Sequence, residues 1–194
     1  MDTIEKVLLT LLKEKEKTAS DLAEQLKTTR QAVWKILNKL YKQELILLNV
    51  ANSKKTSVKI ISLNFENALT KKILSLILTK QTMESQKWGD NFSKLEKYSN
   101  FVLLFGSILN DLNKAEDIDL LIITEKKNFK KIEELILEIQ KIQSKEIHAI
   151  QLTIKEFQSE IKFGNKAYLD ALKKGIVLFG QDEFIEQMEK FNGN

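Results

Sequence analysis

The stretch FVLLFGSILNDLNKAEDIDLLIIT, residues 101–124, is the most informative part of the sequence for predicting the fold. An apolar run, Phe101 to Phe105, ends in Gly106-Ser107, and a segment of nine residues leads to a second apolar run that opens at Asp117. Runs of this length rich in Val, Ile, Leu and Phe are typical of strands buried on both faces. The stretch therefore predicts a strand, a turn and a second strand.

The second strand begins with two aspartates that share one face. Side chains alternate along a strand, so Asp117 and Asp119 project together while Ile118 points the other way. Two like charges held this close repel each other unless a cation lies between them, which favours a site for Mg²⁺ or Mn²⁺. Gly106 permits close approach of an anion, and the hydroxyl and amide of Ser107 can donate to phosphate oxygens. The pattern favours a bound nucleoside triphosphate; the alternative is a surface hairpin with two solvated aspartates.

The residues from Phe105 to Leu120 resemble the signature of the nucleotidyltransferase family of the DNA polymerase beta superfamily. That signature is a hydrophobic residue, Gly-Ser, about nine to thirteen residues, and Asp-hydrophobic-Asp-hydrophobic; the likeness extends over about residues 88–182 and includes the closing segment KKGIVLFG. The resemblance implies metal-dependent transfer of a nucleoside monophosphate to an acceptor hydroxyl. It makes Asp117 and Asp119 catalytic metal ligands and Gly106 and Ser107 nucleotide-binding residues. Related minimal nucleotidyltransferases modify a helical partner protein, which suggests one acceptor by resemblance.

The family also has a third carboxylate on a later strand, and this sequence departs from that pattern. The matching strand offers His148 or Gln151 at its centre and Glu146 only at its start. The Arg-Gly that the family often has after Gly-Ser is replaced by Asn110-Asp111. Compared with the family that it resembles, the chain is expected to be an enzyme with an incomplete carboxylate triad, in which His148 takes the position of the third carboxylate. The alternative is that His148 is an ordinary polar residue of the strand.

The composition is that of a globular protein. Apolar residues make up 43% of the 194, which is enough for a substantial core. No apolar run is long enough to cross a bilayer and the N-terminal pattern is unlike a signal peptide, so a cytoplasmic protein without membrane contact is expected. There is no Cys, which excludes disulfides, thiolate metal sites and a cysteine nucleophile, and a single His argues against a histidine-rich metal site.

Residues 1–64 follow the pattern of a winged helix. Three helical patterns, over about residues 2–15, 18–27 and 30–41, precede a hairpin over residues 45–63. A Thr-x-x-Asp sequence opens the second helix as a capping box. The segment TASDLAEQLKTTRQAVWKILNKLYKQELI resembles the winged helix-turn-helix of bacterial and archaeal transcription regulators.

Positive charge is concentrated in this N-terminal part. It holds twelve Lys and Arg against seven Asp and Glu, and the stretch from Arg30 to Lys59 holds seven bases and one acid. This distribution predicts binding of duplex DNA through the third helix and the wing. The expected contacts are Arg30, Gln31, Trp34, Lys35 and Asn38 in the helix and Lys54 and Lys55 at the hairpin tip. The alternatives are a solvated helix face on which Trp34 covers a neighbouring helix, and a winged helix that docks protein.

The chain is therefore predicted to be α+β. A winged helix-turn-helix (1–64) is followed by a connecting helix and linker (65–87) and a nucleotidyltransferase-like α/β domain with a small mixed sheet (88–194). The connecting helix joins the domains or pairs with its copy in a homodimer, and the polar run from Gln81 to Asp90 indicates a looser segment. Two functions remain open. One is an enzyme that binds Mg²⁺–nucleoside triphosphate; the other is a non-catalytic DNA-binding transcriptional regulator whose second domain senses nucleotide or dimerises.

Overall fold

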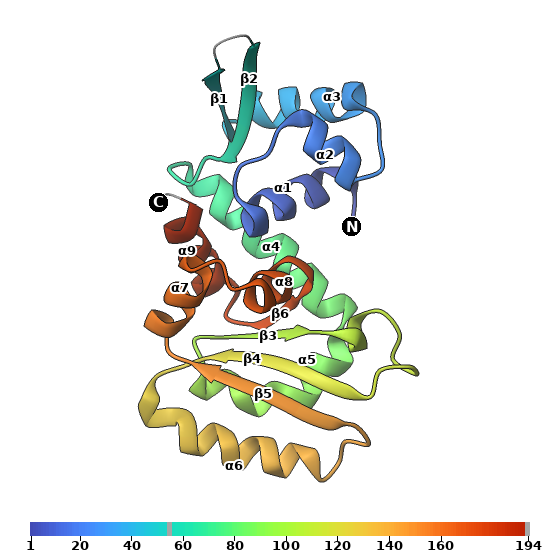
Figure 1. Ribbon diagram of the computed structural model, residues 1–194. Helices are drawn as coiled ribbons and strands as arrows, with labels where there is room; N and C mark the ends of the chain where they lie inside the picture. Colours follow the sequence, from blue (N-terminus) through green and yellow to red (C-terminus); the bar gives the residue numbers. More distant parts are fainter. Residues whose placement is uncertain (54–55, 193–194) are drawn as a thin grey trace. The chain divides into compact units, whose positions relative to one another are not determined.

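The computed structural model describes residues 1–53 and 56–192, and the chain forms two compact units. The N-terminal unit contains Met1–Ile77 together with the residues from Met188 onward, and the C-terminal unit contains Leu78–Gln187. Figure 1 labels the helices and strands in their order along the chain. Their arrangement confirms the predicted α+β class. The divisions of the chain after residues 64 and 87 stay predictions.

The N-terminal unit has a helical core and a two-stranded wing. Its helices α1 (Thr3–Glu14), α2 (Ala19–Gln25) and α3 (Arg30–Lys42) precede the strands β1 (Ile46–Ser53) and β2 (Thr56–Leu63), which pair antiparallel. Lys17, between α1 and α2, exchanges two backbone hydrogen bonds with Ile61 of β2, at 3.0 and 2.8 Å. The core consists of apolar side chains from all these elements: Val7, Leu8, Leu11, Leu12, Leu22, Val33, Leu37, Leu40, Ile46 and Ile61. This arrangement confirms the predicted winged helix.

The capping signals in the sequence mark the starts of α2 and α3. The Thr18 hydroxyl accepts a hydrogen bond from the amide of Asp21 at 3.2 Å, and the Asp21 carboxylate accepts one from the amide of Thr18 at 2.8 Å. Thr29 Oγ1 accepts from the amide of Ala32 at 3.2 Å. These bonds satisfy amides that the first turn of a helix leaves without a backbone partner. The predicted capping box is therefore present.

Lys13 of α1 is a buried charged residue, with only 8% of its surface exposed. Burial penalises the ammonium form and lowers the pKa of Lys13 to about 8, although the neighbouring Glu14 opposes the shift. The stability of the fold therefore depends on pH in the alkaline range.

The end of α9 (Gln181–Asn192) packs within the N-terminal unit. Asn192 Nδ2 donates to the carbonyl oxygen of Leu12 at 3.1 Å, and Glu189 Oε2 pairs with Lys71 Nζ at 2.8 Å. The sequence patterns described above do not predict α9. Its apolar residues Phe184, Ile185 and Met188 are all buried, so tertiary packing stabilises this helix.

The C-terminal unit contains a mixed sheet in the order β5-β4-β3-β6. It is formed by β3 (Phe101–Phe105), β4 (Asp117–Ile123), β5 (Glu146–Leu152) and β6 (Ile176–Phe179). Strand β3 is antiparallel to both of its neighbours, whereas β4 and β5 run parallel, joined by the 3₁₀ turn η3 (Lys126–Asn128) and α6 (Phe129–Gln140) (Figure 1). The small mixed sheet predicted from the sequence is confirmed.

Helices cover both faces of this sheet. On one face, residues of α5 (Gln86–Phe92), the 3₁₀ helix η1 (Ser93–Tyr98) and α6 form one apolar cluster with Val102, Leu104, Ile118, Leu120 and Ile122. On the other face, Phe101 makes edge-to-face contacts with Phe157 of α7 (Ile154–Lys162) and Phe184 of α9, with ring centroids 5.2 and 5.5 Å apart. Helix α8 (Lys166–Lys174) packs beside β3. Burial on both faces explains why the strand sequences are apolar without alternation.

The polar run from Gln81 to Asp90 is helical, contrary to the expected loosening. It spans the end of α4 (Ala68–Glu84) and most of α5. Thr82 Oγ1 donates to the carbonyl oxygen of Val177 at 2.7 Å and accepts from Gln181 Nε2 at 3.1 Å. Since these polar groups find partners in β6 and α9, the segment stays ordered despite its composition.

Within residues 1–53 and 56–192, none of the helices is both long enough and apolar enough to cross a membrane.

Candidate functional site

The turn after β3 brings the backbone against an aspartate of β4. Gly106 follows the last residue of β3 and has φ +85° and ψ −164°, a conformation that is essentially restricted to glycine. Phe105 lies opposite Asp119 in the β3–β4 register. A Cβ on Gly106 would lie 2.0 Å from Asp119 Oδ2, closer than any two such atoms approach. Glycine is therefore required here both by the backbone conformation and by the position of the Asp119 carboxylate.

Ser107 begins the short 3₁₀ helix η2 (Ser107–Leu109) and is exposed. Its carbonyl oxygen accepts hydrogen bonds from the amides of Asn110 and Asp111, at 3.0 and 3.3 Å. The Asp111 carboxylate in turn accepts from the amide of Asn113 at 3.0 Å. Asn110 and Asp111, which replace the family's Arg-Gly, thus stabilise the turn of this loop by hydrogen bonds.

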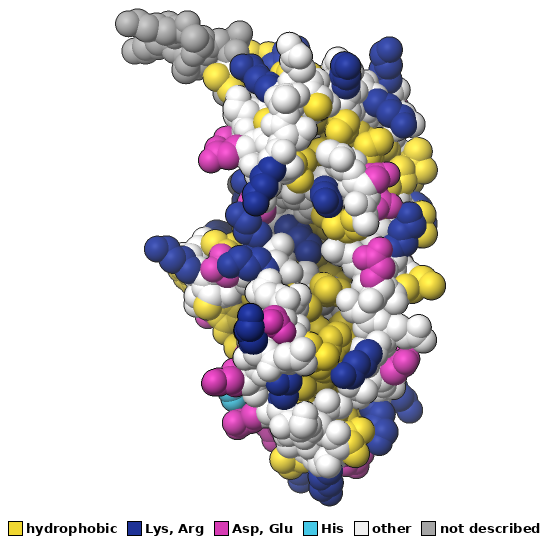
Figure 2. Space-filling model, turned by 90° about the vertical axis from the view of Figure 1, so that its right-hand side faces the viewer, with side chains coloured by type: hydrophobic (Ala, Val, Ile, Leu, Met, Phe, Trp, Pro, Cys, Tyr) yellow, Lys and Arg dark blue, Asp and Glu magenta, His cyan; other side chains and the backbone are white. Residues whose placement is uncertain are grey.

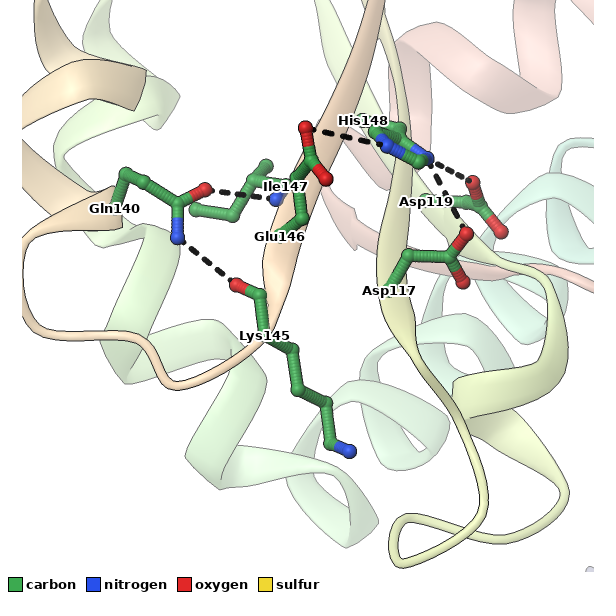
Figure 3. Close-up of polar contacts among 7 residues, drawn as sticks. All are labelled: Asp117, Asp119, Gln140, Lys145, Glu146, Ile147 and His148. Atoms are coloured by element: carbon green, nitrogen blue, oxygen red, sulfur yellow. Dashed lines mark hydrogen bonds and ion pairs between the residues drawn. The ribbon is translucent and has the colours of Figure 1, made fainter.

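Asp117, Asp119 and His148 form a cluster at one end of β4 and β5. The parallel register places Asp119 opposite His148 and Asp117 opposite Glu146, so all four side chains share one face of the sheet. His148 Nδ1 lies 3.2 Å from Asp117 Oδ2 and 3.8 Å from Asp119 Oδ1, and His148 Nε2 lies 3.7 Å from Glu146 Oε1 (Figure 3). One ligand atom from each of the two aspartates and the histidine lies within 4.8 Å of the others. The geometry is that of a candidate metal site.

The negative charges of Asp117 and Asp119 are close enough to repel each other. Partial burial, together with the charge of Asp117, raises the pKa of Asp119, and the neighbouring His148 opposes the shift. Ile118, between the two aspartates, is buried on the opposite face. The two carboxylates are thus held side by side by the pleat of a strand that cannot move away from the core.

Two residues outside the predicted site position the start of β5. Gln140, the last residue of α6, accepts from the amide of Ile147 at 2.8 Å and donates to the carbonyl oxygen of Lys145 at 2.9 Å (Figure 3). The Lys145 ammonium donates to the carbonyl oxygen of Ala115, which lies just before β4. These contacts fix β5, and with it His148, beside β4. No sequence signal identifies Gln140 or Lys145, because their roles depend on tertiary contacts.

The predicted DNA-contacting residues of α3 lie on its surface. Arg30, Gln31, Lys35 and Asn38 are exposed, and Figure 2 shows Lys and Arg side chains scattered over the face that it draws. Trp34 is only partly exposed, and Lys59 Nζ of β2 lies 5.3 Å from its ring centroid. Trp34 therefore contacts the wing strand. Lys54 and Lys55 fall outside the described residues.

A mixed sheet with a Gly-Ser turn facing two aspartates defines a nucleotidyltransferase-like domain joined to a winged helix. The family model described as Polymerase beta, Nucleotidyltransferase matches residues 90–184, which include the turn, both aspartates and His148. The match thus covers most of the C-terminal unit and supports a nucleotidyltransferase-like domain there. No curated protein sequence matches the chain.

Among solved structures, the chain is similar to two bacterial proteins. ZitR of Lactococcus lactis, described as a zinc-responsive MarR family member, is 30% identical over 47% of this chain and 63% of its own, with a TM-score of 0.36. The adhesin competence repressor AdcR of Streptococcus pyogenes is 25% identical over 48% of this chain and 66% of its own, also with a TM-score of 0.36. The match thus spans slightly less than two thirds of these proteins, and TM-scores this low do not define a shared overall fold.

Proposed function

We propose that the C-terminal unit binds a divalent-metal complex of a nucleoside triphosphate and transfers the nucleoside monophosphate to an acceptor hydroxyl. The observation that carries this proposal is the convergence of Asp117, Asp119 and His148 beside the Gly106-Ser107 turn. The convergence occurs within the range that matches the nucleotidyltransferase family.

The residues of the cluster fit a divalent ion. Carboxylate oxygens and an imidazole nitrogen are ordinary metal ligands, and the ligand atoms lie within 4.8 Å of one another. A bound ion would be held by Asp117, Asp119 and His148 and would neutralise phosphate charge and polarise the reacting phosphorus. Partial burial and repulsion from Asp117 together raise the pKa of Asp119, and a bound ion would relieve the repulsion.

The chain itself supplies the phosphate-binding turn. Gly106 leaves the backbone open to an anion, and the exposed Ser107 offers a hydroxyl donor to phosphate oxygens. In the proposed reaction the acceptor oxygen bonds to the α-phosphorus while the bond from that phosphorus to the pyrophosphate oxygen breaks. Pyrophosphate leaves, and the hydroxyl proton passes to solvent or to a carboxylate of the cluster.

Calorimetric titration with nucleotide and Mg²⁺ or Mn²⁺, followed by incubation with radiolabelled nucleoside triphosphates, tests this proposal. The double variant Asp117→Asn, Asp119→Asn is expected to lose metal-dependent nucleotide binding while it keeps its melting temperature or raises it. Glu125→Gln is the matched control, because Glu125 lies just beyond the opposite end of β4 and its side chain is 63% exposed. Unchanged nucleotide affinity in the double variant would refute the proposal. Binding without transfer of label would favour the non-catalytic regulator.

A second proposed function is binding of duplex DNA by the winged helix. It is supported by the exposed Arg30, Gln31, Lys35 and Asn38 on α3 and by the excess of bases in this part of the sequence. The N-terminal part of such a helix enters the major groove, and basic wing residues contact phosphates.

Fluorescence anisotropy of the full chain on random and genomic duplexes, at two salt concentrations, tests the DNA-binding function. Affinity is expected to fall steeply with salt, because bound phosphates release counterions. Replacing Lys54 and Lys55 by Ala should weaken binding to all sequences and flatten the salt slope. If the full chain binds no duplex at low salt, the winged helix is a protein-docking module.

A further inference from the structure

We propose that the cluster selects a first-row transition-metal ion over Mg²⁺, and that His148 Nδ1 is the ligand responsible. This inference rests on the proposed metal-dependent function and extends it by naming the class of ion. It concerns a position where the nucleotidyltransferase signature has a carboxylate and this chain has an imidazole.

The first argument is the chemistry of the donors. Mg²⁺ prefers oxygen ligands in a near-ideal octahedron, whereas imidazole nitrogen suits zinc, iron, nickel and copper ions. His148 Nδ1, with one oxygen each from Asp117 and Asp119, makes a set of one nitrogen and two oxygens. Around a metal ion with bonds of about 2.1 Å, neighbouring donors lie about 3.0 to 3.4 Å apart. The distance of 3.2 Å from Nδ1 to Asp117 Oδ2 falls in this range, and the distance of 3.8 Å to Asp119 Oδ1 would shorten on binding an ion.

The second argument is the orientation of the imidazole ring. Figure 3 shows the His148 ring between Glu146 on one side and the two aspartates on the other. Glu146 Oε1 lies 3.7 Å from Nε2, the nitrogen that faces away from the aspartates. A carboxylate behind a metal-bound histidine holds the proton on the far nitrogen and strengthens the near one as a ligand. At 3.7 Å the two atoms are beyond hydrogen-bond distance, so Glu146 becomes a positioning residue for His148 only when its exposed side chain moves closer to Nε2.

The third argument is that backbone contacts hold the ligands in place. Gln140 bonds both the amide of Ile147 and the carbonyl oxygen of Lys145, so the backbone on the N-terminal side of His148 is tied to α6. Asp119 lies against Gly106, where a Cβ would collide with its carboxylate. Because the backbone is held on both sides of the cluster, substitution of His148 should change the ligand chemistry of the cluster and leave the surrounding backbone in place.

The chain offers an unusually clean test, because it contains one His and no Cys. In protein without a histidine tag, every imidazole resonance in an NMR spectrum belongs to His148. The wild-type full chain is titrated with Zn²⁺ and, separately, with Mg²⁺, while these resonances and the heat of binding are recorded. We expect Zn²⁺ to shift the imidazole resonances at stoichiometric concentration and Mg²⁺ to shift them only at much higher concentration.

Two variants complete the test. His148→Asp restores a carboxylate and should lower the ratio of Zn²⁺ to Mg²⁺ affinity by about tenfold or more, and Glu146→Gln should weaken Zn²⁺ binding by about tenfold while it leaves Mg²⁺ binding unchanged. An affinity ratio that His148→Asp leaves unaltered would overturn the inference alone, provided that metal and nucleotide still bind. Absence of any metal or nucleotide binding in the wild type would overturn the proposed function as well.

Discussion

Replacing Gly106 by Ala tests whether the turn and the proposed metal ligands form one structure. The new Cβ would lie 2.0 Å from Asp119 Oδ2 and 3.0 Å from Asp119 Cγ, so the carboxylate must move. The backbone at φ +85° and ψ −164° is also essentially restricted to glycine. We therefore expect the substitution both to destabilise the protein and to displace a metal ligand.

The magnitude follows from these two effects. A non-glycine residue in this conformation costs about 1–3 kcal/mol, and overpacking adds about 1–3 kcal/mol. The free energy of unfolding should therefore fall by about 2–6 kcal/mol. Gly164→Ala is the matched control, because Gly164 has φ +73° but no atom within 4 Å of the position of its Cβ. There, only the backbone cost of about 1–2 kcal/mol is expected.

Urea unfolding measures the stability of both variants, and calorimetric titration with metal and nucleotide measures the site. Gly106→Ala should lose binding at temperatures where it is fully folded, whereas Gly164→Ala should bind as the wild type does. Wild-type metal affinity in folded Gly106→Ala would show that Asp119 is not held against the turn.

Three further predictions concern the core, the buried lysine and the DNA-binding helix. Leu103 is fully buried, so Leu103→Asp should lower the melting temperature strongly. Leu137 is 65% exposed, so the control Leu137→Asp should leave the melting temperature nearly unchanged. Equal effects of the two substitutions would contradict the packing of β3. Because burial lowers the pKa of Lys13 from 10.5 to about 8, wild-type stability should rise with pH from about 8 to 10.5. Lys13→Met should abolish that rise in pH-dependent urea unfolding and stabilise the protein at pH 7, by about 3 kcal/mol at most; an unchanged profile would contradict the burial of Lys13. In anisotropy assays on the full chain, Arg30→Ala and Gln31→Ala should each erode preference for one DNA site by about 1–3 kcal/mol, and uniform weakening across sequences would contradict base contacts.

Local patterns in the sequence were sufficient to predict most elements. The capping box from Thr18 to Asp21 and the cap at Thr29 involve residues three apart and need no tertiary information. The apolar runs on either side of Gly106-Ser107 predicted two buried strands, and both are buried on both faces. Such signals act within a few residues, so a single sequence contains them in full.

The sequence by itself determined the two architectures, the glycine turn and the pair of aspartates on one face of a strand. Only the tertiary structure placed His148 against both aspartates, because Gln151 and Glu146 were also candidates and the distances depend on the parallel register of β4 and β5. The order of the polar run from Gln81 to Asp90 also depends on distant partners, since Thr82 bonds to Val177 and Gln181. Contacts between residues far apart in the chain leave no local pattern, and so they appear only when the backbone has folded.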